Sequence, residues 1–397
     1  MLTRPPLPNP EEYDIDIETG FVPPNPTELP AYYAPWCNLV SDLPSLLQSK
    51  TLRAKVDDLA SLQIDQLNLQ EHWQRAYVIL GFLTQAYVWQ EKENPSAIVP
   101  ASIGEPFLKV CEHFGTAPVL SYAGGSLWNW TSVAPGGHAN PLETLGNFQA
   151  LKSVASFTGT RDEDAFNLVP TMIEARGARL VQLLLNAIRD SQNGEQQDLV
   201  SVLDICARTF SEMAGLLPNL HDNCDPMFFF SEIRRMLAGS AGAELKGLPD
   251  GVTFQRSNGH HEVVRCVGAS AGQSAFFPFL DHLLGVRHES KFLLEMRAYM
   301  PKKHREFLEA VELLPSLRDL VHDQPQDAAL QTAFQLAIDA FKHWRTKHVV
   351  VVSRYVSQPS KAQANGKPMV EAKGTAGSLP IPFLKQYRDE TTFTPTP

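Results

Sequence analysis

The chain lacks the cysteine patterns that mark metal sites and disulfide frameworks. Its 397 residues include five cysteines, which are scattered, odd in number and never spaced as C-x-x-C. The absence of a C-x-x-C pair argues against the common zinc sites, thioredoxin-like chemistry and covalent attachment of a c-type haem.

Long apolar runs and a basic face are also missing. No stretch of 18 or more apolar residues occurs, and the first residues contain no apolar segment typical of a secretory signal. The formal net charge is −10, with acidic and basic residues interspersed, whereas nucleic-acid binding needs a basic face. We therefore expect a cytoplasmic protein that contacts neither membranes nor nucleic acid.

Signatures of the best-known enzyme classes are absent as well. The sequence has no H-E-x-x-H, G-x-S-x-G or Walker A motif, and no G-x-G-x-x-G after a strand. The segment "GASAGQSA", residues 268–275, lacks the Lys-Ser/Thr ending of a phosphate loop and favours a close approach of the backbone to a flat or bulky group. His260 and His261 have no carboxylate or cysteine neighbours at ligand spacing, which indicates a solvated turn.

What the sequence does have is helical periodicity. Apolar residues recur at helical spacing over residues 69–90 and, in the longest run, over residues 327–355. Pro170 is expected to kink or start a helix. Strand signals are few, although "GVTFQRSN" and "HEVVRCVG" could pair as one small β-hairpin. The predicted fold class is therefore mainly α.

Shifts in composition divide the chain. A turn-rich stretch near residue 120 predicts a boundary between a smaller α-rich N-terminal domain, residues 1–120, and a large helical domain, residues 121–397. The proline-rich start is expected to run extended over the surface until about residue 35. The polar stretch 357–378 is expected to form a mobile loop.

Two histidines near the C-terminal end, His343 and His348, stand before a run of four valines. His348 follows Phe341 by seven residues, so it falls on the buried side of the predicted helix, whereas His343 turns to another face. A histidine on an apolar face can be a satisfied core residue. A neutral imidazole facing an apolar cavity is also what a five-coordinate haem iron needs, with an acceptor fixing the other ring nitrogen. The residues alone leave both interpretations open.

The segment "FFFSEIRR" places Phe229, Phe230 and Arg234 on roughly one side of a helix. Aromatic rings beside a guanidinium would suit a planar aromatic ligand that carries a carboxylate. A core helix whose arginine extends to the surface is the other interpretation.

Taken in order, nine segments of the chain resemble the indoleamine 2,3-dioxygenase family over nearly its whole length. They are "LPAYYAPW", "RAYVILGFLTQAYVW", "SYAGGSLWNW", "SFTGTRDEDAF", "FFFSEIRRML", "GASAGQSA", "FLLEMRAYMPKKHREFL", "KHVVVVSRY" and "EAKGTAGS". The resemblance implies an all-helical domain that binds haem b non-covalently. It implies an enzyme that inserts dioxygen across the indole C2–C3 bond of L-tryptophan, or of a related indoleamine, and gives N-formylkynurenine, the first step of the kynurenine pathway. The implied partners are L-tryptophan, dioxygen and an electron donor that keeps the haem ferrous, and the implied protein is a monomer.

The resemblance also assigns residues around the haem. His348 matches the proximal iron ligand, and His343 is then an ordinary helix residue. Arg345 matches an arginine that pairs with a haem propionate, and Asp281 matches the carboxylate partner of that arginine. Ser270 and Ala271 match a backbone turn packed against both haem and substrate.

On the distal side, the resemblance implies an aromatic substrate pocket. Phe166, Phe229 and Phe230 match its lining, and Tyr122 lies deeper in it. Arg234 matches the arginine that holds the substrate carboxylate. Thr375 matches a loop threonine that helps to bind the substrate ammonium group.

One residue departs from the family pattern. Pro170 falls where the vertebrate enzymes carry a distal serine, and proline can neither donate a proton nor orient a substrate through a hydroxyl. The distal side is then almost free of protonatable groups, and no residue is expected to act as an acid or base. Two other functions stay open: a haem-binding sensor of a gas or of haem with little or no turnover, and a haem-free helical interaction protein.

Overall fold

Helices make up most of the computed structural model, which describes residues 5–91, 93–133, 140–194, 198–241, 247–363, 374–375 and 379–393. The predicted mainly α fold class is confirmed. Within these ranges, no helix combines the length and the apolar character that a membrane span requires.

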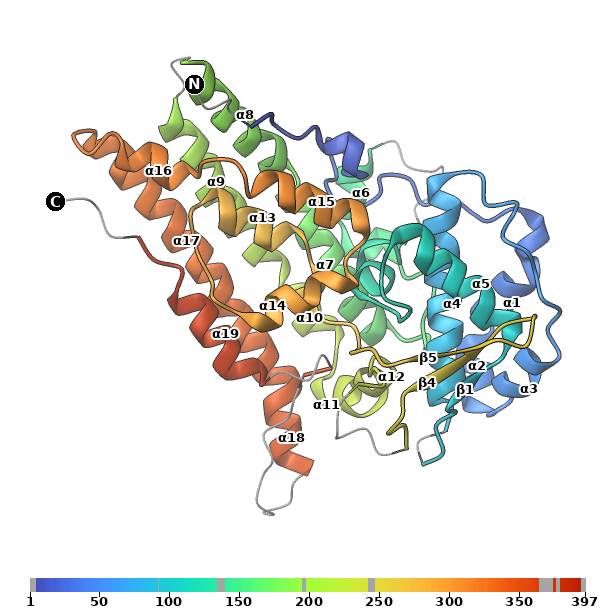
Figure 1. Ribbon diagram of the computed structural model, residues 1–397. Coiled ribbons are helices and arrows are strands. Elements are labelled where there is room, and N and C mark those ends of the chain that lie inside the picture. The colour runs from blue at the N-terminus through green and yellow to red at the C-terminus, as the bar shows by residue number, and fades with distance from the viewer. Residues whose placement is uncertain are drawn as a thin grey trace.

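The helices fall into two groups that lie side by side in Figure 1, with the early helices α1–α5 beside a small sheet and the long helices α7, α9 and α17 in the other group. The helices are α1 (Ala34–Ser41), α2 (Leu43–Gln48), α3 (Leu52–Asp57), α4 (Gln70–Trp89), α5 (Ala101–Phe114), α6 (Pro141–Leu145), α7 (Arg161–Gly177), α8 (Arg179–Asn193), α9 (Leu199–Leu216), α10 (Pro218–Asn223), α11 (Pro226–Phe228), α12 (Arg234–Met236), α13 (Phe276–Leu283), α14 (Lys291–Met296), α15 (Lys302–Val311), α16 (Leu317–His322), α17 (Ala328–Val352), α18 (Gln358–Gln363) and α19 (Pro380–Asp389). Short 3₁₀ turns are η1 (Pro10–Tyr13), η2 (Ala31–Tyr33), η4 (Phe148–Ala150), η6 (Ala271–Gln273) and η7 (Arg297–Tyr299), and π-helical turns are η3 (Ala123–Leu127), η5 (Phe229–Ile233) and η8 (Ser353–Ser357).

Helix α4 confirms the predicted helix over residues 69–90. Every residue from Arg75 to Trp89 is buried, so the helix is covered all round rather than along one apolar stripe. The indole Nε1 of Trp89 donates to the carbonyl of Ala238 at 3.0 Å, and Gln85 donates to the same oxygen. These bonds tie the first group of helices to the segment that follows α12.

The predicted hairpin is also confirmed. Strands β4 (Val252–Gln255) and β5 (His261–Val264) pair antiparallel, and a short strand β1 (Ile98–Val99) adds in parallel to β4. Exposed His260 lies in the turn between β4 and β5, as expected, whereas His261, also exposed, is the first residue of β5 and pairs with Gln255. A second, two-stranded sheet joins β2 (Thr131–Ser132) to β3 (Leu151–Lys152).

The proline-rich start is anchored more firmly than the sequence predicted. Ile15, Phe21 and Val22 are buried, and the Phe21 ring meets the rings of His304 and Phe276 at 5.0 and 6.3 Å. Apolar side chains between the prolines thus fasten this segment to α13 and α15 of the large helical group. The predicted domain boundary near residue 120 stays a prediction. Both β1 and the proline-rich start precede this boundary, yet they contact β4, α13 and α15, which follow it.

The longest helix, α17, packs most extensively on α9 and continues into η8 and α18. The predicted mobile loop over residues 357–378 is therefore wrong in its first part, since Ser357 ends η8 and residues 358–363 form α18. Residues 364–373 and 376–378 lie outside the described ranges. Pro170 does not start a helix, because α7 begins at Arg161 and runs past it.

A buried polar cluster joins α17 to α13 and α19. Arg345 of α17 forms an ion pair with Asp281 of α13, and both side chains are less than a tenth exposed. Tyr387 of α19 also donates to Asp281, and its ring lies 3.8 Å from the Arg345 guanidinium carbon. Burial alone would raise the pKa of Asp281, but Arg345 and His288 hold it below its ordinary value.

The hydroxyl of Thr391 and the ring of His288 complete this cluster. Arg345 Nη1 donates to Thr391 and, at 3.2 Å, to His288 Nε2. His288 Nδ1 lies 2.5 Å from Glu390 Oε2, and His288 Nε2 lies 3.4 Å from Asp281 Oδ2. Asp281, Arg345 and the end of α19 thus form one hydrogen-bonded unit, called here the α19 clamp.

Replacing Asp281 with asparagine should destabilise the fold strongly, because the buried guanidinium of Arg345 then loses its charged partner. We expect the free energy of unfolding to fall by about 3 kcal/mol or more, measured by equilibrium urea unfolding at pH 7.

A matched control is Asp389→Asn. Asp389 forms an ion pair with Arg388, but its side chain is 59% exposed, so its loss should change the free energy of unfolding far less. Equal effects of the two substitutions would contradict the view that the clamp stabilises the fold through a buried charge pair.

Candidate functional site

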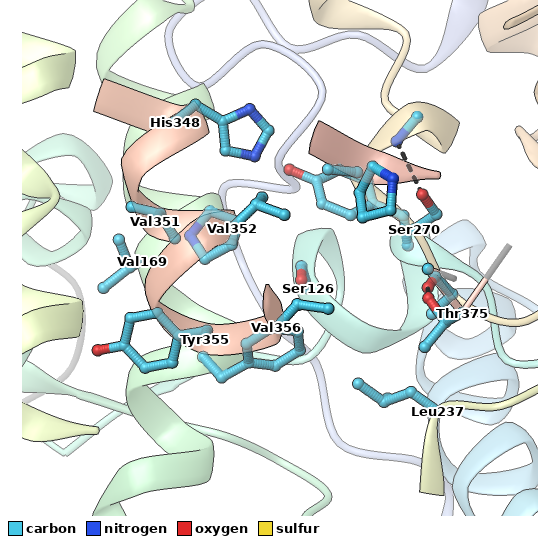
Figure 2. A pocket seen from close by; sticks show the side chains of 18 of the residues that line it. Ser126, Val169, Leu237, Ser270, His348, Val351, Val352, Tyr355, Val356 and Thr375 are labelled. Atoms are coloured by element: carbon cyan, nitrogen blue, oxygen red, sulfur yellow. Dashed lines mark hydrogen bonds between the residues drawn. The ribbon is translucent and has the colours of Figure 1, made fainter. Parts of the chain in front are cut away.

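A cavity of about 270 Å³ lies where α17 and η8 face α7, η3 and the turn at residues 269–272. Figure 2 shows His348, Val351, Val352, Tyr355 and Val356 on one side of it and Ser270 and Thr375 on the other. Most of the lining is apolar, which is typical of a ligand pocket. The remaining lining residues are Tyr122, Gly125, Ser126, Phe166, Asn167, Val169, Pro170, Ile173, Leu217, Leu220, Phe229, Arg234, Leu237, Ala269, Ala271, Gly272, Phe277, Phe292, Trp344, Gly374, Pro380, Phe383 and Leu384.

His348 extends from α17 to the cavity (Figure 2). Burial, and secondly the nearby charge of Arg345, lower its pKa to about 4, so the ring is neutral at pH 7. The imidazole forms no hydrogen bond with any residue that the structure describes, and its closest ring neighbour is Trp344, at 5.6 Å between centroids. The second-shell acceptor expected for its other nitrogen is therefore not found among the described residues. A neutral imidazole with free nitrogens is suited to bind a metal.

The structure separates the two histidines as the spacing predicted. His343 is exposed on another face of α17. The valines after His348 divide in the same way: Val351 and Val352 line the cavity, Val349 is buried and Val350 is 56% exposed. Only half of the valine run therefore contributes to the cavity wall.

The residues predicted for the distal pocket meet around this cavity, with one exception. Tyr122, Phe166, Phe229 and Arg234 all line it, and the rings of Phe166 and Phe229 lie 4.5 Å apart. Phe230 is not among the lining residues. Its ring lies 5.1 Å from the Arg234 guanidinium carbon instead, so it contacts the arginine rather than the cavity.

The turn at residues 268–275 forms the opposite wall. Ser270 Oγ accepts from the backbone N of Gly272 at 3.2 Å, and Gln273 donates to Gly268 O at 2.9 Å. Gln273 also accepts from the backbone N of Tyr122 at 2.9 Å, which fixes the turn to the start of η3. Residues 269–272 line the cavity, and the close approach of their backbone to a flat group stays a prediction.

Thr375 holds its short described segment against this turn. Its hydroxyl donates to Ala269 O, and its carbonyl accepts from Gly268 N at 3.1 Å. The Thr375 hydroxyl is thus engaged with the turn in this structure.

A smaller cavity of about 50 Å³ shares His348 and Trp344 with the first one. Arg345, Phe383 and Tyr387 also line it, so the α19 clamp borders it directly. The Arg345 guanidinium keeps one donor, Nε, without a hydrogen-bond partner among the described residues. Because Arg345 lines the smaller cavity, an anionic group of a larger ligand held there would lie near its guanidinium. Asp281 does not line either cavity, so it acts on the site only through Arg345.

A buried carboxyl lies behind the cavity wall. Glu174 of α7 is 1% exposed and accepts from Ser274 Oγ at 2.7 Å, while its other oxygen lies beside the Tyr122 phenol without a hydrogen bond to a described residue. Burial raises its pKa to about 7 and that of Tyr122 well above its ordinary value. The cavity lining itself contains no Asp or Glu, and no histidine besides His348, among the described residues.

The three π-helical turns of the described chain all reach this cavity. Gly125 and Ser126 belong to η3, Phe229 to η5, and Tyr355 and Val356 to η8. Such turns insert an extra residue into a helix and occur often at functional sites. No sequence pattern indicated these π-helical turns. Nor did any pattern indicate that Gln273, Glu174 and residues of α19 would lie beside the cavity. Only the glycine pair in "SYAGGSLW" was visible, as a turn signal.

Comparison with known proteins gives one consistent result. The family model described as indoleamine 2,3-dioxygenase matches residues 9–394. The chain is 34% identical to the 6-hydroxytryptophan 2,3-dioxygenase of Fusarium equiseti, over 96% of both chains. It is 32% identical to indoleamine 2,3-dioxygenase 2 of Homo sapiens, over 96% of this chain and 94% of that one. It is also 32% identical to the indoleamine 2,3-dioxygenase of Saccharomyces cerevisiae, over 98% and 94%.

The raised pKa of Glu174 predicts a pH-dependent stability. The folded protein holds a proton that the unfolded chain loses above about pH 4.5, so this carboxyl makes the fold less stable as the pH rises from about 4.5 to about 7. Glutamine does not titrate, so the Glu174→Gln variant should not lose this part of its folding stability as the pH rises. The stability of the variant relative to the unchanged protein should rise across that range, by up to about 1.4 kcal/mol per pH unit.

Urea unfolding at half-unit pH steps measures the difference between the two curves. Glu309→Gln, an exposed carboxylate on α15, is the matched control and should run parallel to the unchanged protein. A parallel Glu174→Gln curve would show that the buried carboxyl is ionised throughout.

Proposed function

The chain belongs to the indoleamine 2,3-dioxygenase family, whose members are haem-dependent dioxygenases of indole compounds, and on that premise we propose that it oxidises L-tryptophan to N-formylkynurenine. In this reaction both atoms of dioxygen are inserted across the indole C2–C3 bond. The observation that carries the proposal is the neutral, unbonded imidazole of His348 at the edge of an apolar cavity.

The residues around His348 fit haem b. Its imidazole nitrogen would bind the iron, and the apolar side chains of Val351, Val352 and Phe277 would contact the flat macrocycle. Arg345, which lines the smaller cavity, would pair with a propionate, while Asp281 and the α19 clamp hold the guanidinium in place. When bound, the haem supplies the iron chemistry that activates dioxygen.

Arg234 orients the substrate. It lines the cavity, and the Phe230 ring beside it limits the positions that its guanidinium can take. A substrate carboxylate paired with Arg234 would place the indole ring among Phe166 and Phe229. Thr375 would contribute to the ammonium group only by sharing or changing its present hydrogen bond with Ala269.

The lining supports a reaction without a protein base. The described lining residues include no carboxylate, and Pro170 offers no hydroxyl. The tasks left to the chain are orientation of the indole and exclusion of water, to which the aromatic side chains of the lining would contribute. One relative is named for 6-hydroxytryptophan, so a ring-substituted tryptophan is the second candidate substrate.

Replacing His348 with alanine should abolish stable haem loading, because no other imidazole lines the cavity among the described residues. Absorbance of the purified variant in the Soret region, normalised to protein, measures the loss. His343→Ala is the matched control, since His343 lies exposed on the same helix, and it should load haem fully. Full loading of His348→Ala would refute the assignment of the ligand.

Replacing Arg234 with glutamine should raise the KM for L-tryptophan about tenfold or more, because a charge-assisted bond to a carboxylate is worth about 1.5–3 kcal/mol. Formation of N-formylkynurenine under reducing conditions is the measurement. Arg235→Gln removes the same charge one residue away, where the side chain lies near Trp89, and should leave KM within about twofold.

The same assay separates an enzyme from a sensor. If the unchanged protein binds carbon monoxide but gives no product from tryptophan or its ring-substituted forms, the dioxygenase proposal fails. An unchanged KM in Arg234→Gln, with normal turnover, would refute the substrate orientation alone.

A further inference from the structure

The two glycines of "SYAGGSLW", Gly124 and Gly125, have very different surroundings. A Cβ on Gly124 would lie 2.5 Å from the Tyr77 ring, so packing requires glycine there. A Cβ on Gly125 would meet nothing within 4 Å, although Gly125 is buried and lines the large cavity. The missing side chain of Gly125 is therefore open space within the cavity.

Ser126, the next residue, adds a hydrogen-bonding group to the same wall. It is 6% exposed, and its carbonyl accepts from Thr171 Oγ1 at 3.0 Å and from Asn129 N at 3.1 Å, which fixes its backbone. Its hydroxyl forms no hydrogen bond with any residue that the structure describes. In Figure 2, Ser126 lies between the helix that carries His348 and the segments that carry Ser270 and Thr375.

The other hydroxyls of the serine and threonine residues along this cavity are already engaged. Ser270 Oγ accepts from Gly272, and Thr375 donates to Ala269. Ser126 therefore differs from them in offering a donor and an acceptor that no described residue uses, and a ligand in the cavity could bond to both.

The open space at Gly125 and the hydroxyl of Ser126 occur together in η3, which packs against α7. Arg234, the residue proposed to hold the substrate carboxylate, belongs to another segment, α12. Gly125 leaves space for about one extra heavy atom, and Ser126 can donate to it or accept from it. A hydroxyl on the benzene ring of the indole meets both conditions, since it is small, polar and able to bond with another hydroxyl.

We infer that this cavity is built to accept tryptophan hydroxylated on its benzene ring, with Gly125 giving the room and Ser126 the hydrogen bond. The inference rests on the proposed function, because it assumes that the amino-acid end of the substrate is held at Arg234. In this inference η3 selects the substrate. No hydrogen bond described above links η3 to Arg234 or to His348.

The haem-loaded protein tests this with L-tryptophan, 5-hydroxy-L-tryptophan and 6-hydroxy-L-tryptophan. The measured quantity is the selectivity ratio, kcat/KM for each hydroxylated compound divided by kcat/KM for L-tryptophan. In Ser126→Ala the ratio for the preferred isomer should fall about three- to tenfold, the value of one neutral hydrogen bond. In Gly125→Ala the added methyl group should lower it at least about tenfold, and the helical backbone of Gly125 accommodates alanine.

Matched controls lie on the exposed face of α9. Gly215→Ala adds a methyl group in open solvent, and Ser211→Ala removes a hydroxyl there, so both should leave the ratio unchanged. Equilibrium dialysis of the same three compounds without dioxygen gives dissociation constants, whose ratio should move in the same direction as the selectivity ratio.

The two proposals fail in different ways. If the unchanged protein forms no product from any of the compounds, the dioxygenase assignment fails and dialysis alone decides the role of η3. If product forms but Gly125→Ala and Ser126→Ala affect tryptophan and hydroxytryptophans equally, the inference is overturned while the proposed function stands.

Discussion

The site depends on one electrostatic constraint, the placement of an uncharged imidazole at the edge of an apolar cavity with no hydrogen-bond partner among the described residues. Removing His348 from water penalises its charged form, and the positive charge of Arg345 one turn earlier adds to that penalty. Both effects keep a lone pair available. Arg345 can stand so close only because Asp281 neutralises it in the interior, so the ligand histidine and the α13–α17 ion pair form one arrangement.

Helical irregularity is what gives the cavity its shape. Regular helices pack closely along their length, as α17 does on α9, and leave no room for a large flat group. At η3, η5 and η8 the extra residue in the turn changes which side chains reach inward, and each of these turns supplies part of the lining. The cavity thus lies where three helical segments depart from regularity together.

Much of the fold could be predicted from local pattern. Periodicity located α4 and α17, turn residues located the β4–β5 hairpin, and a spacing of seven residues placed His348, but not His343, on the inner face. Family resemblance located Arg234, Phe229 and Phe166 at the cavity. It placed Phe230 in the lining, which is wrong, because a ring four residues from an arginine on one helix can stack on it instead.

What pattern could not reveal were contacts between segments far apart in the chain. Gln273 bonds to Tyr122, 151 residues away, and Ser274 bonds to Glu174, 100 residues away. Nothing in the sequence distinguishes these polar side chains from polar side chains on the surface. The open space at Gly125 is of the same kind, since only the neighbours of a glycine show whether it is needed for packing or leaves a void.

The α19 clamp has a consequence for the length of the chain. Tyr387, Thr391 and Glu390 complete the surroundings of Arg345, and Phe383 and Leu384 close the cavity on that side. A protein truncated before Pro380 would keep every predicted substrate and iron contact, yet would lose one wall and open a buried guanidinium to solvent. The last described helix and the two residues after it are therefore integral to the domain, and C-terminal trimming or fusion has to begin beyond Thr391.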